Sequence, residues 1–212
     1  MGEFSSLVRG DADIATLATY LDALPAAQRQ AEVTGLGRRD QARLFDKAED
    51  ARPIRLSHFV PDRLDALTAV HHPGRNTILT LPYFQRFQKR FARADESTLM
   101  GYNVSNASFV HPGYFVAYET DGNATWEARG GVVVDYHRVP DGPVPVGWPP
   151  VRPNSEGLQR LVYHQTRDFM RGVSRHVSIG RASRETEPRG DEILDYWFTL
   201  CRIDAGRIDA EA

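Results

Sequence analysis

The spacing of apolar residues changes near residue 98, from the helical period of about 3.6 to the period of two that is typical of strands. Upstream of that point, the first apolar set with helical spacing consists of Ile14, Leu17, Leu21 and Leu24. Asp11 or Asp13 can cap this helix, while Pro25 ends it and suits the first turn of a second helix. A third helix is expected over residues 38–51. The first fifty residues should therefore form short amphipathic helices that need a partner surface.

Two further segments also show helical spacing. In residues 80–94, Phe84, Phe87 and Phe91 lie at positions i, i+3 and i+7, with basic residues over much of the remaining surface. Such a mixture can indicate a nucleic-acid surface, but a core-facing aromatic stripe with a solvated basic back is favoured. Residues 156–173 are expected to form one long helix, whose buried stripe consists of Leu158, Leu161, Val162, Phe169 and Val173.

Downstream of the change, alternation predicts strands over residues 98–104, 113–120, 130–138, 176–183 and 194–203. Turn residues between the second and third of these indicate an antiparallel hairpin. Pro73 and Gly74 indicate a turn over residues 71–76. Residues 139–156 contain six prolines and are expected to form an extended connection or a lid, which Trp148 anchors to the body of the protein.

These elements predict an α+β fold, in which an antiparallel sheet with the order strand–strand–helix–strand–strand forms the C-terminal half. Residues 1–97 are expected to form a mostly helical part that packs on the sheet. Residues 98–212 are expected to form the antiparallel sheet with its one long helix. A chain of 212 residues is long enough for both parts to belong to a single domain.

The composition is that of a globular protein, with 41% apolar and 25% charged residues and a formal net charge of −2. This balance argues against nucleic acid and membranes as partners. The 24 arginines and 2 lysines indicate either oxyanion binding or a bacterial-like coding bias, and their even spread favours the bias. Cys201 is the only cysteine, and the sequence shows no secretory signal or apolar membrane span, so we expect a cytoplasmic protein.

Well-marked catalytic motifs are missing from the sequence. It has no Gly-rich phosphate loop, no paired-histidine zinc helix, no spaced cysteine ligands and no Gly-x-Ser-x-Gly elbow. NTPases, dinucleotide-dependent enzymes, zincins and common serine hydrolases are therefore disfavoured. The histidines, with His111 as a further candidate, match no ligand spacing. No metal is predicted, and the cofactor remains open.

One face of the predicted sheet gathers polar and aromatic side chains. Residues two positions apart share a face of a strand, which places Asp135 beside His137 and brings further residues to them if the strands are neighbours. An imidazole oriented by a carboxylate can act as a general base, and aromatic rings can wall a pocket. The candidate catalytic residues are Asp135, His137, His176 and Ser178. The candidate ligand-binding residues are Tyr114, Tyr118, Trp148, Trp197, Thr199 and Cys201.

The favoured function is the binding of a small, partly apolar ligand in a concavity formed by the sheet, the helices and the proline-rich segment. One alternative is an enzyme in which Asp135 and His137 perform acid–base chemistry. A second alternative is a non-enzymatic module whose aromatic residues form the interface of a homo-oligomer. The plainest interpretation of the same residues is the water-exposed face of an ordinary antiparallel sheet.

Overall fold

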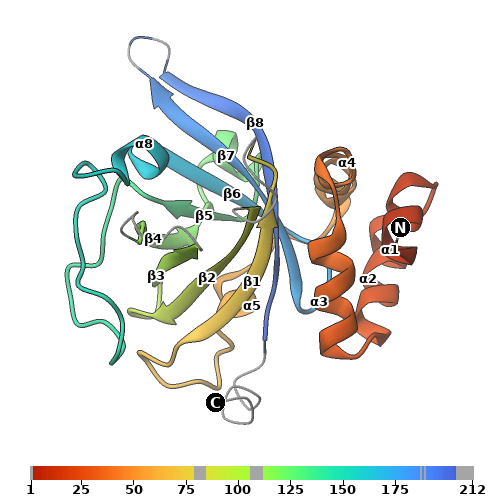
Figure 1. The fold of residues 1–212 in the computed structure, drawn as a ribbon, viewed down its shortest axis with the longest axis horizontal. Coiled ribbons are helices and arrows are strands. Elements are labelled where there is room, and N and C mark those ends of the chain that lie inside the picture. The colour runs from red at the N-terminus through yellow and green to blue at the C-terminus, as the bar shows by residue number, and fades with distance from the viewer. Residues whose placement is uncertain (1, 79–84, 106–111, 187, 189, 204–212) are drawn as a thin grey trace.

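Eight antiparallel strands dominate the structure, a computed structural model that describes residues 2–78, 85–105, 112–186, 188 and 190–203. Each strand pairs with the next along the chain, and β8 pairs with β1, so the sheet closes into a barrel (Figure 1). The strands are β1 (Val70–Asn76), β2 (Arg86–Arg93), β3 (Thr98–Ser105), β4 (Tyr114–Glu119), β5 (Val132–Asp135), β6 (Thr166–Gly172), β7 (Val177–Thr186) and β8 (Gly190–Cys201). The prediction of an α+β fold is wrong, because a closed barrel is the dominant fold and the helices lie beside it.

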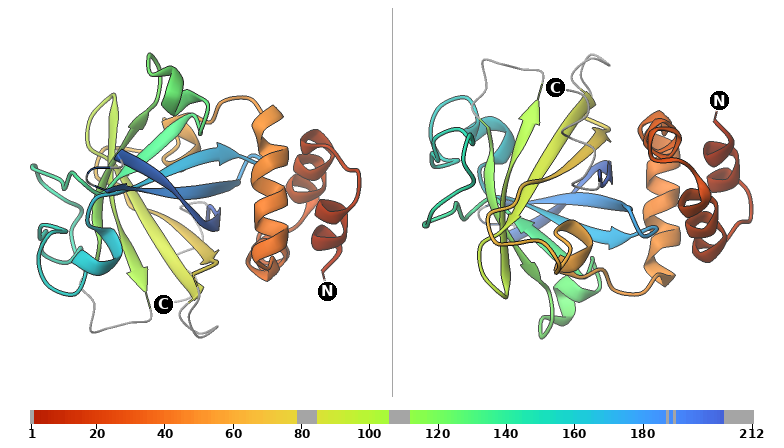
Figure 2. Two further views of the ribbon diagram at one scale, coloured as in Figure 1. Left: turned by 90° about the horizontal axis from the view of Figure 1, so that it is seen from above. Right: turned by 90° about the horizontal axis from the view of Figure 1, so that it is seen from below.

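Short helices precede the barrel and pack against its outside or at one end (Figure 2). They are α1 (Glu3–Arg9), α2 (Ile14–Ala23), α3 (Ala26–Gly35), α4 (Arg38–Lys47), the 3-10 turn η1 (Ala48–Asp50) and α5 (Leu56–Phe59). The three predicted helices correspond to α2, α3 and α4. Asp13 caps α2, since its carboxylate accepts a hydrogen bond from the Thr16 N–H at 2.8 Å. Later in the part of the chain that the structure describes, α7 (Ala124–Glu127) and α8 (Arg160–Tyr163) are single turns.

Two apolar cores hold these parts together. The first lies inside the barrel and includes Phe91, Phe115, Val134, Met170 and Phe198. The second lies between the N-terminal helices and the outer face of β7 and β8, and it includes Leu17, Leu21, Leu44, Val177, Ile179 and Trp197. Successive strand residues point to opposite faces, so β8 contributes to both cores, with Phe198 and Leu200 in the first and Trp197 and Cys201 in the second.

Three strands occupy segments for which the sequence predicts other structure. β2 lies in the predicted helix 80–94, and β6 together with α8 replaces the long helix predicted over 156–173. β1 replaces the turn predicted over 71–76. Gly74 lets β1 approach β8 closely, because a Cβ atom there would lie 2.2 Å from the Thr199 carbonyl oxygen. The strands predicted after residue 98 are confirmed as β3, β4, β5, β7 and β8.

The two ends of the barrel are covered by different elements. At one end, α5 contributes Leu56 and Phe59 to the core inside the barrel. At the other end lies α8, which is tied to β7 by Arg184. The Arg184 guanidinium donates hydrogen bonds to the carbonyl oxygens of Leu161 and Val162, at 3.2 and 3.1 Å. β1 and β2 lie before residue 98, so both predicted parts of the chain contribute strands to the barrel.

The proline-rich segment runs along the outside of the barrel. Side chains of the segment and side chains of the barrel both hold it in place. Trp148 packs edge-on against Tyr102, with ring centroids 4.9 Å apart, which agrees with its predicted anchoring role. The Tyr114 hydroxyl donates a hydrogen bond to the Pro149 carbonyl oxygen at 2.5 Å, and Asn154 Nδ2 donates one to the Tyr114 carbonyl oxygen at 2.7 Å. These contacts hold the segment against β3 and β4.

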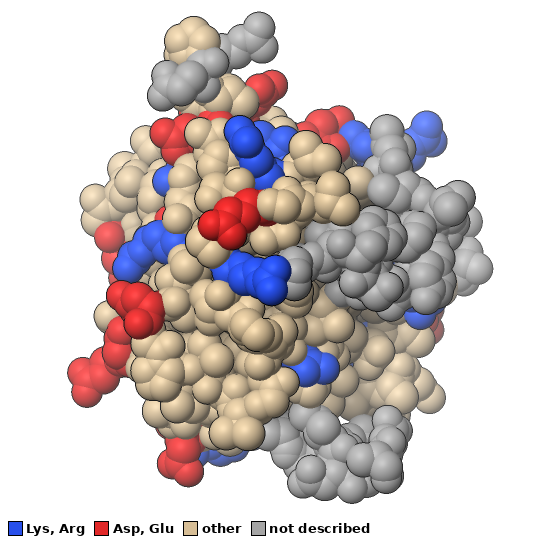
Figure 3. Space-filling view, turned by 60° about the vertical axis from the view of Figure 1, so that its left-hand side comes forward, with Lys and Arg blue, Asp and Glu red and all other residues tan. Residues whose placement is uncertain are grey.

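Figure 3 turns the side of the barrel that carries this segment toward the viewer. Charged side chains lie mainly in the upper part and along the left edge of the view, while uncharged residues cover most of the described surface in its lower part. In the proline-rich segment and around α8, the exposed large apolar residues are Val146, Leu158, Leu161 and Val162.

Gly101 of β3 lies where the barrel interior has no room for a side chain. A Cβ atom there would lie 2.4 Å from Phe115 Cζ and 2.3 Å from the Arg90 carbonyl oxygen, and the second clash involves backbone. We therefore expect Gly101→Ala to lower the free energy of unfolding by at least about 1 kcal/mol, as overpacking does. Urea denaturation of the variant and the wild type measures this difference in the free energy of unfolding. Gly142→Ala is the control, because nothing lies within 4 Å of its Cβ position. Equal effects of the two substitutions would contradict the tight packing at Gly101.

Candidate functional site in the barrel interior

A cluster of polar residues lies inside the barrel. Pairing between strands places Lys89 of β2 beside His72 of β1 and Asn103 of β3. Tyr136, which directly follows β5, and Asp168 of β6 lie on other parts of the inner wall. All five residues are buried, and Lys89 is only 1% exposed. Charged residues are almost never fully buried unless they are paired, so Lys89 is expected to have a partner inside the barrel.

Lys89 Nζ donates hydrogen bonds to three groups inside the barrel. It lies 3.0 Å from Asn103 Oδ1 and 3.0 Å from Asp168 Oδ2, and it also contacts the Tyr136 hydroxyl oxygen. Asn103 Nδ2 donates to the same hydroxyl oxygen at 2.7 Å. The Tyr136 hydroxyl in turn lies 3.3 Å from Asp168 Oδ2. Lys89 and Asp168 thus form a buried ion pair whose ammonium group uses all three donors.

Aromatic rings surround the Lys89 nitrogen. The ring centroids of Tyr136 and Phe198 lie 4.9 Å from Nζ, and those of Phe115 and Phe87 lie at 5.1 and 5.8 Å. Ring faces attract a cation, but they do not replace its hydration shell. Burial accordingly lowers the pKa of Lys89 from its usual value, and the opposite charge of Asp168 only partly offsets this effect. The amine therefore loses its proton more readily than an exposed lysine does.

Further tyrosines lie near Asp168. Tyr163 stacks on Tyr136 with ring centroids 5.2 Å apart, and burial raises the pKa of Tyr163 to about 12. Burial, and then the charge of Asp168, raises the pKa values of Tyr136 and Tyr196. Among the described residues, Asp168 accepts hydrogen bonds through Oδ2 alone, and the Tyr196 hydroxyl has no partner. The Asp168 side chain keeps 5% of its surface accessible and Tyr196 is half-buried, so both can offer an oxygen to a ligand.

Asp135, by contrast, faces outward. Its carboxylate accepts hydrogen bonds from the Tyr118 hydroxyl at 2.8 Å and from the His137 backbone N–H at 3.0 Å. It also pairs with Arg167, whose Nε lies 3.5 Å from Oδ1. The imidazole of His137 lies against Glu185 instead, with Nε2 3.7 Å from Oε2. Tyr118 and Asp135 are thus brought together, whereas the Asp135 carboxylate meets the backbone of His137 and not its ring.

His176 and Ser178 lie away from Asp135. Ser178 is fully buried and pairs with Leu200, and it turns inward because the residues on either side of it face the helices. His176 precedes β7 at the α5 end of the barrel, where its Nδ1 lies 3.3 Å from the Arg202 guanidinium. β6 separates β5 from β7 in the barrel. The four candidate catalytic residues therefore do not converge on one site.

The candidate ligand-binding residues that lie on strands face outward, at separate places. Tyr114 lies beneath the proline-rich segment, with its ring centroid 6.3 Å from that of Trp148. Trp197, Thr199 and Cys201 lie beneath the N-terminal helices, where Thr199 Oγ1 donates a hydrogen bond to a carbonyl oxygen of α3 at 3.3 Å. These side chains join elements of the fold to one another. Their part in ligand binding stays a prediction.

Sequence reasoning missed the interior cluster because Lys89 and Asp168 lie in segments that also fit a helical pattern. Two signals could have found it. Phe87, Lys89 and Phe91 alternate with period two, as the inward residues of a strand do. Lys89 is also one of only 2 lysines in a chain with 24 arginines, which marks its position as chemically distinct.

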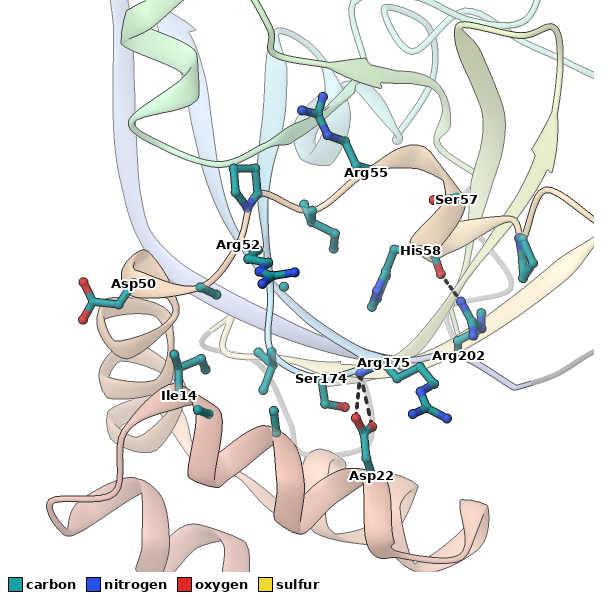
Figure 4. A pocket seen from close by; sticks show the side chains of 18 of the residues that line it. Ile14, Asp22, Asp50, Arg52, Arg55, Ser57, His58, Ser174, Arg175 and Arg202 are labelled. Carbon is teal, nitrogen blue, oxygen red and sulfur yellow. Dashed lines mark hydrogen bonds between the residues drawn. The ribbon is translucent and has the colours of Figure 1, made fainter.

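A cleft of about 960 Å³ lies outside the barrel, between α2, α5 and the loop that joins β6 to β7 (Figure 4). Its lining includes five arginines, Arg52, Arg55, Arg63, Arg175 and Arg202. The ring of His58 points into the cleft, and its Nε2 is buried without a partner among the described residues. Burial, with the nearby charges of His72, Arg202 and His176, holds the pKa of His58 well below its usual value. His58 therefore remains neutral at pH 7.

Among the described residues, no group of three or more His, Cys, Asp or Glu side chains is placed to hold a metal ion, and His111 lies outside that part of the chain. Within the same part, the helices all lack the length and apolar character needed to cross a membrane.

Comparison with other proteins gives no further guide: no family model, no curated protein and no solved structure matches this chain.

Proposed function

We propose that the barrel binds one small, largely apolar molecule that carries a carbonyl or hydroxyl oxygen. The observation that supports this most is the Lys89–Asp168 ion pair, which lies among aromatic rings inside a closed barrel. The interior of an eight-stranded barrel is filled by side chains or holds one small ligand. Small-molecule sites are mostly apolar with a few well-placed polar groups, and the interior cluster supplies such groups.

The ion pair has no clear purpose in stabilising the barrel. Replacing a buried ion pair with apolar residues of similar volume is often neutral or even stabilising. Phe91 and Met170, which lie two positions from Lys89 and Asp168 on the same strands, belong to the apolar core. Apolar residues at positions 89 and 168 would continue that core. Titratable groups placed there instead favour a binding or chemical role.

The cluster and the nearby Tyr196 offer a ligand both kinds of hydrogen-bonding group. Asp168 Oδ1 is an acceptor and the Tyr196 hydroxyl is a donor, and neither has a partner among the described residues. The charges of Lys89 and Asp168 cancel, so a neutral ligand suits the interior better than an ion. Tyr163 and Phe198 add aromatic surface near these polar groups.

The proposal is tested with 6-propionyl-2-dimethylaminonaphthalene, a neutral aromatic ketone whose fluorescence moves to shorter wavelength in apolar surroundings. A fluorescence titration should show saturable binding to a single class of site, with a blue shift. Tyr196→Phe removes a donor but keeps the ring. It should weaken binding about tenfold, because one hydrogen bond contributes about 1 to 1.5 kcal/mol.

Tyr102→Phe is the matched control, since Tyr102 faces outward, where its hydroxyl accepts a hydrogen bond from Arg90 at 3.0 Å. This variant should bind the ketone as the wild type does. Two outcomes would count against ligand binding in the barrel. One is the absence of saturable binding to the wild type, and the other is an equal loss of affinity in both variants.

The alternative functions have less support from the contacts. Acid–base catalysis by Asp135 and His137 is disfavoured because the carboxylate and the imidazole have different partners. A subunit interface built from the aromatic residues of the sheet is disfavoured because Tyr114 and Trp197 are buried within the chain. A cytoplasmic location and the exclusion of nucleic acid as a partner remain predictions.

A further inference from the structure

Lys89 differs in chemical type from the other cationic residues of its strand, which are Arg86, Arg90 and Arg93. A guanidinium remains charged in proteins, whereas a lysine amine can lose its proton and attack a carbonyl carbon. An ion pair with Asp168 does not by itself require lysine, because arginine is well suited to buried carboxylate pairs. In a chain with 24 arginines and 2 lysines, an amine at this position indicates that the amine itself is used.

We propose that Lys89 forms an imine with an aldehyde group of the molecule that the barrel binds. This inference rests on the ligand binding proposed above and names the class of ligand. Groups that can move protons flank the nitrogen, since Asp168 Oδ2 lies 3.0 Å away and the Tyr136 hydroxyl is in contact. The surrounding rings limit the access of bulk water, which would otherwise hydrolyse an imine.

The reaction balances with these groups and needs no oxidant or reductant. The Lys89 ammonium first passes a proton to Asp168, which leaves a neutral amine beside a carboxylic acid. The nitrogen lone pair then attacks the aldehyde carbon, and the carbonyl π electrons move to oxygen. A proton moves from nitrogen to that oxygen, which gives a neutral carbinolamine. Asp168 then protonates the hydroxyl group, the C–O bond breaks, water leaves and a C=N bond forms. The product is an iminium ion paired with the Asp168 carboxylate, so the charge of the interior is unchanged.

The probe for this step is 6-dimethylamino-2-naphthaldehyde, the aldehyde counterpart of the ketone used above. The full chain is incubated with the aldehyde and cyanoborohydride at pH 7, which reduces an imine to a stable secondary amine. Peptide mapping by mass spectrometry then locates the label. We expect Lys89 to be labelled about tenfold or more faster than Lys47, because burial lowers the pKa of Lys89 and a larger share of its amine is the unprotonated nucleophile. Without the reductant, a protonated imine should add an absorbance band at longer wavelength than the free aldehyde.

Lys47 is the internal control, because its Nζ donates to the carbonyl oxygens of Gly10 and Ala12 outside the barrel. Lys47→Arg should keep the label on Lys89, while Lys89→Arg should lose it and still show a folded circular dichroism spectrum. Comparing the two lysines within the wild type needs no variant, so misfolding of Lys89→Arg cannot hide the result. Label on Lys47 and the terminal amine alone, in protein that binds the ketone, would overturn the imine and leave ligand binding intact. Failure to bind either probe would overturn both.

Discussion

Replacing Lys89 with methionine should lower the free energy of unfolding by about 3 to 5 kcal/mol, the usual effect of breaking a buried ion pair. Methionine has a similar length, so the shape of the interior is largely kept. Asp168 then loses the positive charge that lies 3.0 Å from its Oδ2, while it remains in an apolar interior that holds a lone carboxylate poorly. The measurement is urea denaturation at pH 7, followed by circular dichroism.

A second substitution separates the effect of charge from the effect of shape. Asp168→Asn in the Lys89→Met background removes the unpaired charge, so most of the lost stability should return. Lys47→Met is the control and should change stability by less than about 1 kcal/mol, because Lys47 lies outside the barrel and contacts carbonyl oxygens. If Lys89→Met has no larger effect than Lys47→Met, Lys89 and Asp168 do not act as a buried ion pair.

The same ion pair explains why the barrel is hard to recognise in the sequence. An inward lysine interrupts the apolar alternation of β2, so Phe84, Phe87 and Phe91 fit a helical stripe with a basic back. In β6, Asp168 faces inward. Local pattern rules fail most often where a site places polar groups inside a core. The two strands that lie in predicted helices, β2 and β6, are the two that carry this charge pair.

Local patterns were sufficient elsewhere in the chain. The Asp13 cap and the alternation in β3, β4 and β5 depend on neighbouring residues, and the structure confirms these elements. Closure of the sheet depends on contacts between distant residues, such as the hydrogen bond from Thr77 to the Trp197 carbonyl oxygen across 120 positions. No local pattern reports such a pairing, and without it the sheet cannot be recognised as a barrel.

The candidate catalytic residues do not gather on one face of the sheet, for a related reason. Both faces of β7 are buried, because Ile179 faces the helices while Ser178 faces the interior of the barrel. An apolar face therefore does not identify the inside of this strand. Assigning Ile179 to the sheet's main core put Ser178 on the same side as Asp135, although the two residues face opposite sides of the barrel wall.

Lowering the pH from 7 to 5 should reduce the free energy of unfolding through His58 by up to about 2 kcal/mol, the limit for a ring that stays neutral in the native protein. Burial, reinforced by nearby His72, Arg202 and His176, holds the pKa of His58 in the native protein well below its usual value. In the unfolded chain the ring is solvated and takes up a proton near pH 6.5. Below that pH the unfolded state binds more protons than the native state, so stability falls as the pH falls.

His58→Phe tests this assignment because it removes the titrating nitrogens and keeps a ring that can pack edge-on against Phe59, as His58 does with centroids 5.2 Å apart. The decline in stability between pH 7 and pH 5 should become smaller in this variant, by up to about 2 kcal/mol. His137→Phe is the control and should leave the decline in place, because the His137 ring lies at the surface beside Glu185. If His58→Phe shows the same decline as the wild type, protonation of another group causes the loss of stability. His71 would then be the first to replace, since burial lowers its pKa as well.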